Sequence, residues 1–162
     1  MKSDLDSAQR QAKWSRRKTL RRKPDFRLFG DDDLKFAWAA YRKGALSEIS
    51  DEFKTEGLTP EKFKEAFGLA VVANYDFGWT MLAPDPVGLI FAFQAHKNTD
   101  RSPFLIIGDM VWFPWSSARQ RIEAAVNFFN EARKEVAFME YARKEDKKFF
   151  EMIAKHGIIL RS

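Results

Sequence analysis

Three apolar runs lie close together in the middle of this 162-residue chain. They cover residues 78–82, 87–93 and 104–113, and only short turn-forming or polar segments separate them. Apolar runs of this length between turn signals are typical of buried strands. The segments on either side show helical spacing instead, which excludes an all-helical and an all-β protein. We therefore predict an α/β (α+β) protein whose mixed β-sheet is flanked by helices.

A short strand and two helices are predicted before these runs. Residues 25–29 alternate like a half-buried strand, and the aspartates at 31–33 are expected to cap and begin the next helix. Apolar side chains recur at helical spacing over 34–41. The second helix starts at Pro60 behind Thr59, a typical N-cap residue.

Helices and strands alternate after the central runs. We predict a helix over 118–134, a strand over 136–141, a helix over 144–156 that Gly157 ends, and a terminal strand over 158–160. The 118–134 helix is expected to turn these side chains inward: Ile122, Ala125, Val126 and Phe129. Four large side chains are expected to be buried where helices meet the sheet: Trp38, Phe67, Leu89 and Phe129.

The composition excludes several classes of protein. There is no cysteine, so disulfides and thiolate chemistry are excluded, and His96 and His156 lack the spacing of metal ligands. We therefore expect no metal site. No apolar run approaches the roughly 18 residues of a membrane span, and the first residues do not look like a signal peptide. We expect synthesis in a reducing cytoplasm and no association with a membrane.

Positive charge is concentrated at the N-terminus. Residues 1–23 carry nine Lys and Arg side chains against two aspartates, a net charge of +7, whereas the whole chain carries +5. We interpret 1–23 as a basic N-terminal arm that binds an anionic partner, and 24–162 as the folded domain. The alternative is that the arm is a disordered tail that only aids solubility. The residues expected to contact nucleic acid or a partner protein are Arg10, Lys13, Arg16, Arg17, Lys18, Arg21, Arg22 and Lys23.

Several segments resemble, in the same order, parts of the GNAT acyltransferase superfamily. Residues 26–34 are similar to its opening strand and helix start, 86–90 to its central strand, and 149–158 to its closing helix and turn. The resemblance covers roughly residues 25–161 and implies a GNAT-like mixed sheet.

A narrower resemblance concerns GNAT-like proteins of tailed bacteriophages. It rests on the pairing of residues 38–44 with 112–117 and 119–124. It implies a protein made in the host cytoplasm, with incorporation into the virion as one outcome.

The expected cofactor motif is degenerate. The superfamily binds acetyl-CoA with a glycine-containing loop between the fourth strand and the long helix, where backbone amides approach the pyrophosphate. The matching residues 115–121 contain no glycine. If a cofactor binds, the resemblance assigns it to Ser116, Ser117, Arg119 and Arg121. The alternative is that a serine caps the helix and the arginines are solvated.

The expected catalytic groups also depart from the superfamily. Many members place an acid, a tyrosine, in the last helix to protonate the CoA thiolate, and the matching residue here is Phe150. If the protein is active, Tyr141 is the substitute acid and Asp109 the candidate general base. If it is not, Tyr141 is a packed strand residue.

Two functions remain. The first is a non-catalytic virion or assembly protein, for example at the head–tail junction, without a cofactor. Its arm binds DNA or another virion protein such as a portal or adaptor. The sequence does not decide whether the protein forms homo-oligomers. The second is a phage-encoded acyltransferase that uses acetyl-CoA.

Overall fold

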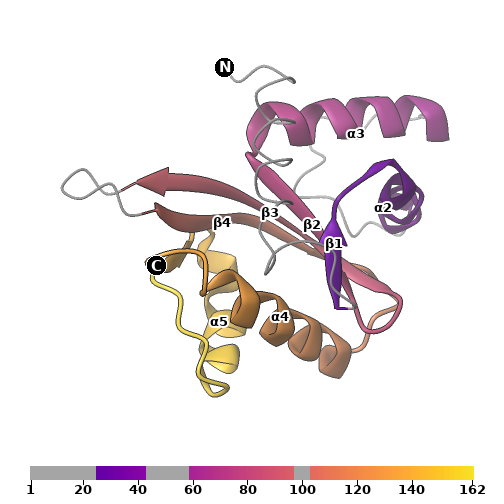
Figure 1. Ribbon diagram of the computed structural model, residues 1–162. Helices are drawn as coiled ribbons and strands as arrows, with labels where there is room; N and C mark the ends of the chain where they lie inside the picture. The colour runs from indigo at the N-terminus through magenta and orange to yellow at the C-terminus, as the bar shows by residue number, and fades with distance from the viewer. Residues whose placement is uncertain (1–24, 43–58, 97–102) are drawn as a thin grey trace.

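The computed structural model describes residues 25–42, 59–96 and 103–162. These residues form one five-stranded sheet with the order β1-β2-β3-β4-β5. Helices α2 (Leu34–Arg42) and α3 (Pro60–Asn74) lie on one side of it. Helices α4 (Ala118–Ala132) and α5 (Lys147–Ala154) lie on the other, as Figure 1 shows. The predicted mixed sheet flanked by helices is confirmed.

The strands follow the predicted runs closely. They are β1 (Phe26–Leu28), β2 (Phe77–Leu82), β3 (Pro86–His96), β4 (Pro103–Trp112) and β5 (Met139–Tyr141). The first four pair antiparallel, and β5 pairs parallel with β4. Strand β3 extends to His96, beyond the predicted end at residue 93, because Gln94, Ala95 and His96 pair with β4.

Alternation along the strands divides the core into two layers. Phe77, Trp79 and Met81 face α4 and α5, and the Trp79 ring lies 5.0 Å from the ring of Phe128. On the other side, Phe91 packs below Phe67 of α3 with ring centroids 6.1 Å apart. Each helix pair therefore covers one face of the sheet with its own apolar layer.

The chain begins its first helix differently from the prediction. Asp31–Asp33 form one 3₁₀ turn, and Gly30 is the residue in the N-cap position. Asp33 is buried. Its carboxylate is satisfied there, because it accepts hydrogen bonds from the Gly30 amide at 3.1 Å and from the Arg27 guanidinium at 2.5 Å. By contrast, Thr59 caps α3 as predicted, since its hydroxyl accepts a hydrogen bond from the Lys62 amide.

The C-terminal elements are shorter than predicted. Residues 144–146 form a 3₁₀ turn before α5, and β5 has only three residues. The predicted terminal strand over 158–160 is wrong, because the segment pairs with the sheet through a single bridge between Glu140 and Arg161. Gly157 ends the helix as predicted, with a φ of +82° that glycine adopts without strain.

The inward face of α4 is also corrected. Ala125 and Phe129 are buried, but Ile122 and Val126 are only half-buried on the flank of the helix. The side chains of α4 that face the core are Ala124, Ala125, Phe128, Phe129 and Ala132. Helix α4 is therefore rotated about its axis relative to the prediction. Its Phe128 and Phe129 side chains, and not Ile122 and Val126, face the sheet.

Candidate functional site

The candidate site lies where β4 and β5 separate. Strand β5 pairs with residues 105–107 of β4, and the Ala142 amide then donates to the Ile107 carbonyl at 3.0 Å. Beyond this point the chain leaves the sheet for α5, while β4 continues beside β3 to Trp112. A register shift opposite Phe91 and Ala92 adds one residue to β4 just before Asp109. The C-terminal half of β4 and the loop before α4 therefore form one edge of this region.

Asp109 lies on the α3 side of that edge. The Tyr75 hydroxyl donates a hydrogen bond to one carboxylate oxygen, and the Arg143 guanidinium donates to the other at 2.9 Å. The contact joins the end of α3, strand β4 and the segment that leads to α5. The sequence analysis did not find Tyr75 or Arg143, because 34 residues separate each of them from Asp109 and no local pattern links them.

Tyr141 faces the opposite layer. Its ring stacks on the ring of Phe150 with centroids 4.6 Å apart, and it packs against the core between the sheet and the α4–α5 pair. The Tyr141 amide donates to the Arg161 carbonyl at 2.9 Å. The two candidate catalytic residues therefore pack on different faces of the sheet, and the structure does not bring them together.

The side chains of Ser117 and Gln120 cap the N-terminus of α4. The Ser117 hydroxyl accepts a hydrogen bond from the Gln120 amide at 3.1 Å, and the Gln120 side chain accepts one from the Ser117 amide at 2.9 Å. This is a reciprocal capping box, which occupies two amides that would otherwise face an anion. The Ser-x-x-Gln spacing of residues 117–120 carries this signal, but the sequence analysis considered only a serine cap.

Ser116 and Arg121 form a second internal contact in the same loop. The Arg121 guanidinium donates to the Ser116 hydroxyl at 2.8 Å and to the Phe113 carbonyl at 3.0 Å. The Ser116 hydroxyl in turn donates to the same carbonyl at 2.6 Å. Burial lowers the pKa of the Arg121 guanidinium below its ordinary value. Two of the four residues assigned to a cofactor are therefore bound to each other and to the loop backbone.

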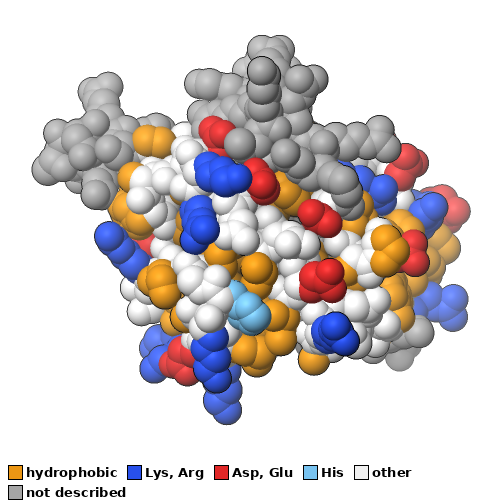
Figure 2. Space-filling model, turned by 60° about the horizontal axis from the view of Figure 1, so that its bottom comes forward, with side chains coloured by type: hydrophobic (Ala, Val, Ile, Leu, Met, Phe, Trp, Pro, Cys, Tyr) orange, Lys and Arg blue, Asp and Glu red, His pale blue; other side chains and the backbone are white. Residues whose placement is uncertain are grey.

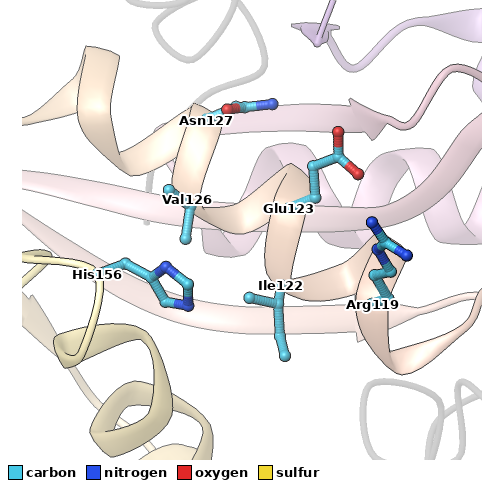
Figure 3. Close-up of a pocket in the computed structure, with 6 residues that line it drawn as sticks. All are labelled: Arg119, Ile122, Glu123, Val126, Asn127 and His156. Atoms are coloured by element: carbon cyan, nitrogen blue, oxygen red, sulfur yellow. The ribbon is translucent and has the colours of Figure 1, made fainter.

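Arg119 is an exposed residue that lines an open groove along α4. Figure 3 shows the groove between α4 and the residues after α5, with the His156 imidazole turned toward Ile122 and Val126. Its volume is about 640 Å³, and it is lined by Arg119, Ile122, Glu123, Val126, Asn127 and His156. None of the other three candidate cofactor residues lines this groove.

The remaining expectations concern the arm, a metal site and a membrane span. The eight cationic residues of the arm that were expected to bind a partner lie outside the described residues. Within 25–42, 59–96 and 103–162, no three His, Cys, Asp or Glu side chains gather as metal ligands would. None of the helices in those ranges is both long and apolar enough to cross a membrane.

Solved structures share the architecture. A possible acetyltransferase from Clostridium difficile 630 superposes with a TM-score of 0.56 at 11% identity, over 85% of this chain and 91% of its own. A candidate acetyltransferase from Agrobacterium tumefaciens C58 gives a TM-score of 0.55 at 14% identity, over 85% and 94%. A probable acetyltransferase gives 0.52 at 11% identity, over 81% and 86%.

The chain has a GNAT-like fold. The similarity covers most of each chain, and the order of strands and helices matches the resemblance found in the sequence. At identities this low the similarity establishes the fold alone. No protein-family model and no curated protein matches the sequence.

Acetyl-CoA is the cofactor that a GNAT-like fold implies, and the residues at its expected place do not fit it. The capping box of Ser117 and Gln120 closes the start of α4. The loop has no glycine, so it lacks the residue type that lets a backbone approach a pyrophosphate most closely. Arg121 is directed inward to Phe113 and Ser116.

Proposed function

We propose that this chain is a non-catalytic protein of a tailed bacteriophage, a virion or assembly component built on a GNAT-like scaffold. Its basic segment 1–23 binds DNA or another virion protein such as a portal or adaptor. The observation that carries the proposal is the closed N-terminus of α4. There, Ser117 and Gln120 cap each other, and Arg121 donates to the Ser116 hydroxyl and the Phe113 carbonyl, where the cofactor of an acetyltransferase would bind.

The distribution of charge supports the binding role of the arm. Residues 1–23 carry +7, so the remaining residues carry a net charge of −2. On the face formed by α4 and α5, Figure 2 shows Lys and Arg side chains interspersed with Asp and Glu side chains. Mixed surface charge gives little attraction for a polyanion, whereas a dense basic segment gives a strong one.

A second candidate is a phage-encoded acyltransferase that uses acetyl-CoA. The similar solved structures favour it, because they are described as acetyltransferases. In this case Asp109 would act as general base and Tyr141 as acid. The separation of these residues by the sheet is less favourable to a shared active site.

The binding role is tested with the full-length protein. Arg16, Arg17, Arg21 and Arg22 are changed together to Gln, and binding to duplex DNA is measured at about 50 and 200 mM salt. Several phosphate contacts would weaken binding by orders of magnitude over this range, and the variant would lose most of the affinity. The matched control removes four exposed cations from the folded domain by changing Lys144, Lys147, Lys148 and Lys155 to Gln.

The outcomes separate the partners. DNA affinity that only the arm variant loses supports a nucleic-acid partner. If neither protein binds DNA but only the wild type enters assembled particles, the partner is a virion protein. Equal behaviour of the wild type, the arm variant and the control in both assays contradicts the proposed role of the arm.

A further inference from the structure

The cofactor of an acetyltransferase has to connect two places in this fold. Its pyrophosphate lies at the loop before the long helix, and its thiol reaches the acid in the last helix. In this chain the two places are the loop that contains Ser116 and Ser117, and position 150 of α5. The connecting passage therefore runs past the end of β4, between the start of α4 and the middle of α5.

Trp112, the last residue of β4, lies at this passage. Its ring rests on the backbone of Gly88 in the neighbouring strand, where a Cβ atom would be only 2.7 Å from Trp112 Cε3. Phe149 of α5 contacts the ring with a centroid distance of 5.2 Å. The Arg121 guanidinium of α4 lies 6.0 Å from the same ring. Three elements thus converge on the Trp112 indole.

Aromatic contacts continue from Trp112 to the position of the missing acid. Phe149 contacts Phe150 at 5.7 Å, and Phe150 stacks on Tyr141 at 4.6 Å. Phe150 is buried and also contacts Phe129 of α4 at 5.7 Å. These side chains form a continuous series of ring contacts from the end of β4 to the end of β5.

We infer that Trp112 and Phe149, which are both half-buried, form a plug that fills the passage which acetyl-CoA would need. This inference rests on the proposed non-catalytic function and deepens it, because it gives the residues that replace the cofactor. The plug is apolar, whereas the cofactor's linker carries amide groups that need hydrogen-bond partners in a buried passage. Trp112 and Phe149 also attach α5 to the end of β4.

Truncation of the plug tests the inference. Trp112→Ala and Phe149→Ala are each expected to lower the melting temperature of the full-length protein by several degrees, because each removes a half-buried ring from a contact between packed elements. The matched control is Met152→Ala on the same helix, whose side chain is 41% exposed, and it is expected to change the melting temperature little. Phe149→Leu removes less volume and keeps the test usable if the alanine variants do not fold.

Indole is the probe for the opened passage. The apolar gap that the truncated Trp112 leaves has the shape of an indole, and a ligand that binds the native state raises its melting temperature. About 1 mM indole is therefore expected to raise the melting temperature of Trp112→Ala by a few degrees and to leave the wild type unchanged. The milder variant Phe149→Leu, without indole, is expected to lower the melting temperature by a few degrees.

Two results would overturn the plug. One is a loss in Trp112→Ala, Phe149→Ala and Phe149→Leu no larger than the loss in Met152→Ala. The other is loss without rescue by indole, which would mean that no passage exists behind the rings. Neither result depends on the arm, so a failure of DNA or particle binding would refute the proposed partner and leave the plug intact.

Discussion

Thr80 places a hydroxyl group in the completely buried interior of β2, on the side of the sheet that faces α2 and α3. Among the residues that the structure describes, this hydroxyl has no hydrogen-bond partner. A buried polar group without a partner costs about 1–3 kcal/mol. Thr80→Val keeps the shape and removes the hydroxyl, so it is expected to raise the free energy of unfolding by about 1 kcal/mol. Urea unfolding monitored by circular dichroism measures the change.

Thr59 supplies the matched control for this prediction. Its hydroxyl accepts the Lys62 amide at 3.2 Å at the start of α3. Thr59→Val is therefore expected to lower the free energy of unfolding by about 1 kcal/mol. Equal and negative effects of the two substitutions would show that the Thr80 hydroxyl is satisfied.

Phe129 tests the packing of α4. Its side chain is fully buried between α4, the sheet and α5, and it contacts the rings of Phe128 and Phe150. Phe129→Ala is expected to lower the free energy of unfolding by about 3–5 kcal/mol. Leu69→Ala, on the exposed side of α3, is the control. A loss below about 1 kcal/mol in Phe129→Ala would contradict its place in the core.

Sequence patterns predicted burial well where a residue lies at the centre of an apolar stripe. Phe67, Leu89 and Phe129 are buried as expected. Trp38 is only half-buried, because it lies at the margin of its layer, stacked on Tyr41. The rotation of a helix about its axis depends on its neighbours in space. For this reason the pattern could not show that α4 buries Phe128 and leaves Val126 on its flank.

At the scale of elements, the start of α4 gives a direct prediction. Ser117→Ala removes the side-chain half of the capping box and is expected to lower the free energy of unfolding by about 1 kcal/mol. Ser117→Asp keeps an acceptor at the same position and is the matched control. If Ser117→Ala is no less stable than Ser117→Asp and the wild type, the cap does not stabilise the native state.

Element bounds were predictable where a local signal exists. Thr59 with Pro60 marks the start of α3, and Gly157 marks the stop after α5. The extension of β3 and the shortness of β5 were not predictable, because both depend on pairing with β4. Likewise, the contact of Asp109 with Tyr75 and Arg143 depends on chain segments that only the fold brings together.

At the scale of the whole molecule, the fold is that of acetyltransferases, whereas the candidate site does not fit their cofactor. The order of elements and the similar structures establish the GNAT-like fold. The loop before α4 and the end of β4 are closed by internal contacts of Ser117, Arg121 and Trp112. The absence of glycine in the loop was visible in the sequence. The contact between Trp112 and Phe149 was not, because it joins the end of a strand to a helix 37 residues later.

The central claim is that the protein keeps this scaffold but does not bind acetyl-CoA. Calorimetric titration of the full-length wild type with acetyl-CoA, up to about 1 mM, tests it most directly, since a complex with a Kd of about 1 mM would be about half-formed at the end of the titration. The account predicts no heat beyond that of dilution. Saturable binding at micromolar concentration that is lost in Arg119→Ala and Arg121→Ala would contradict it.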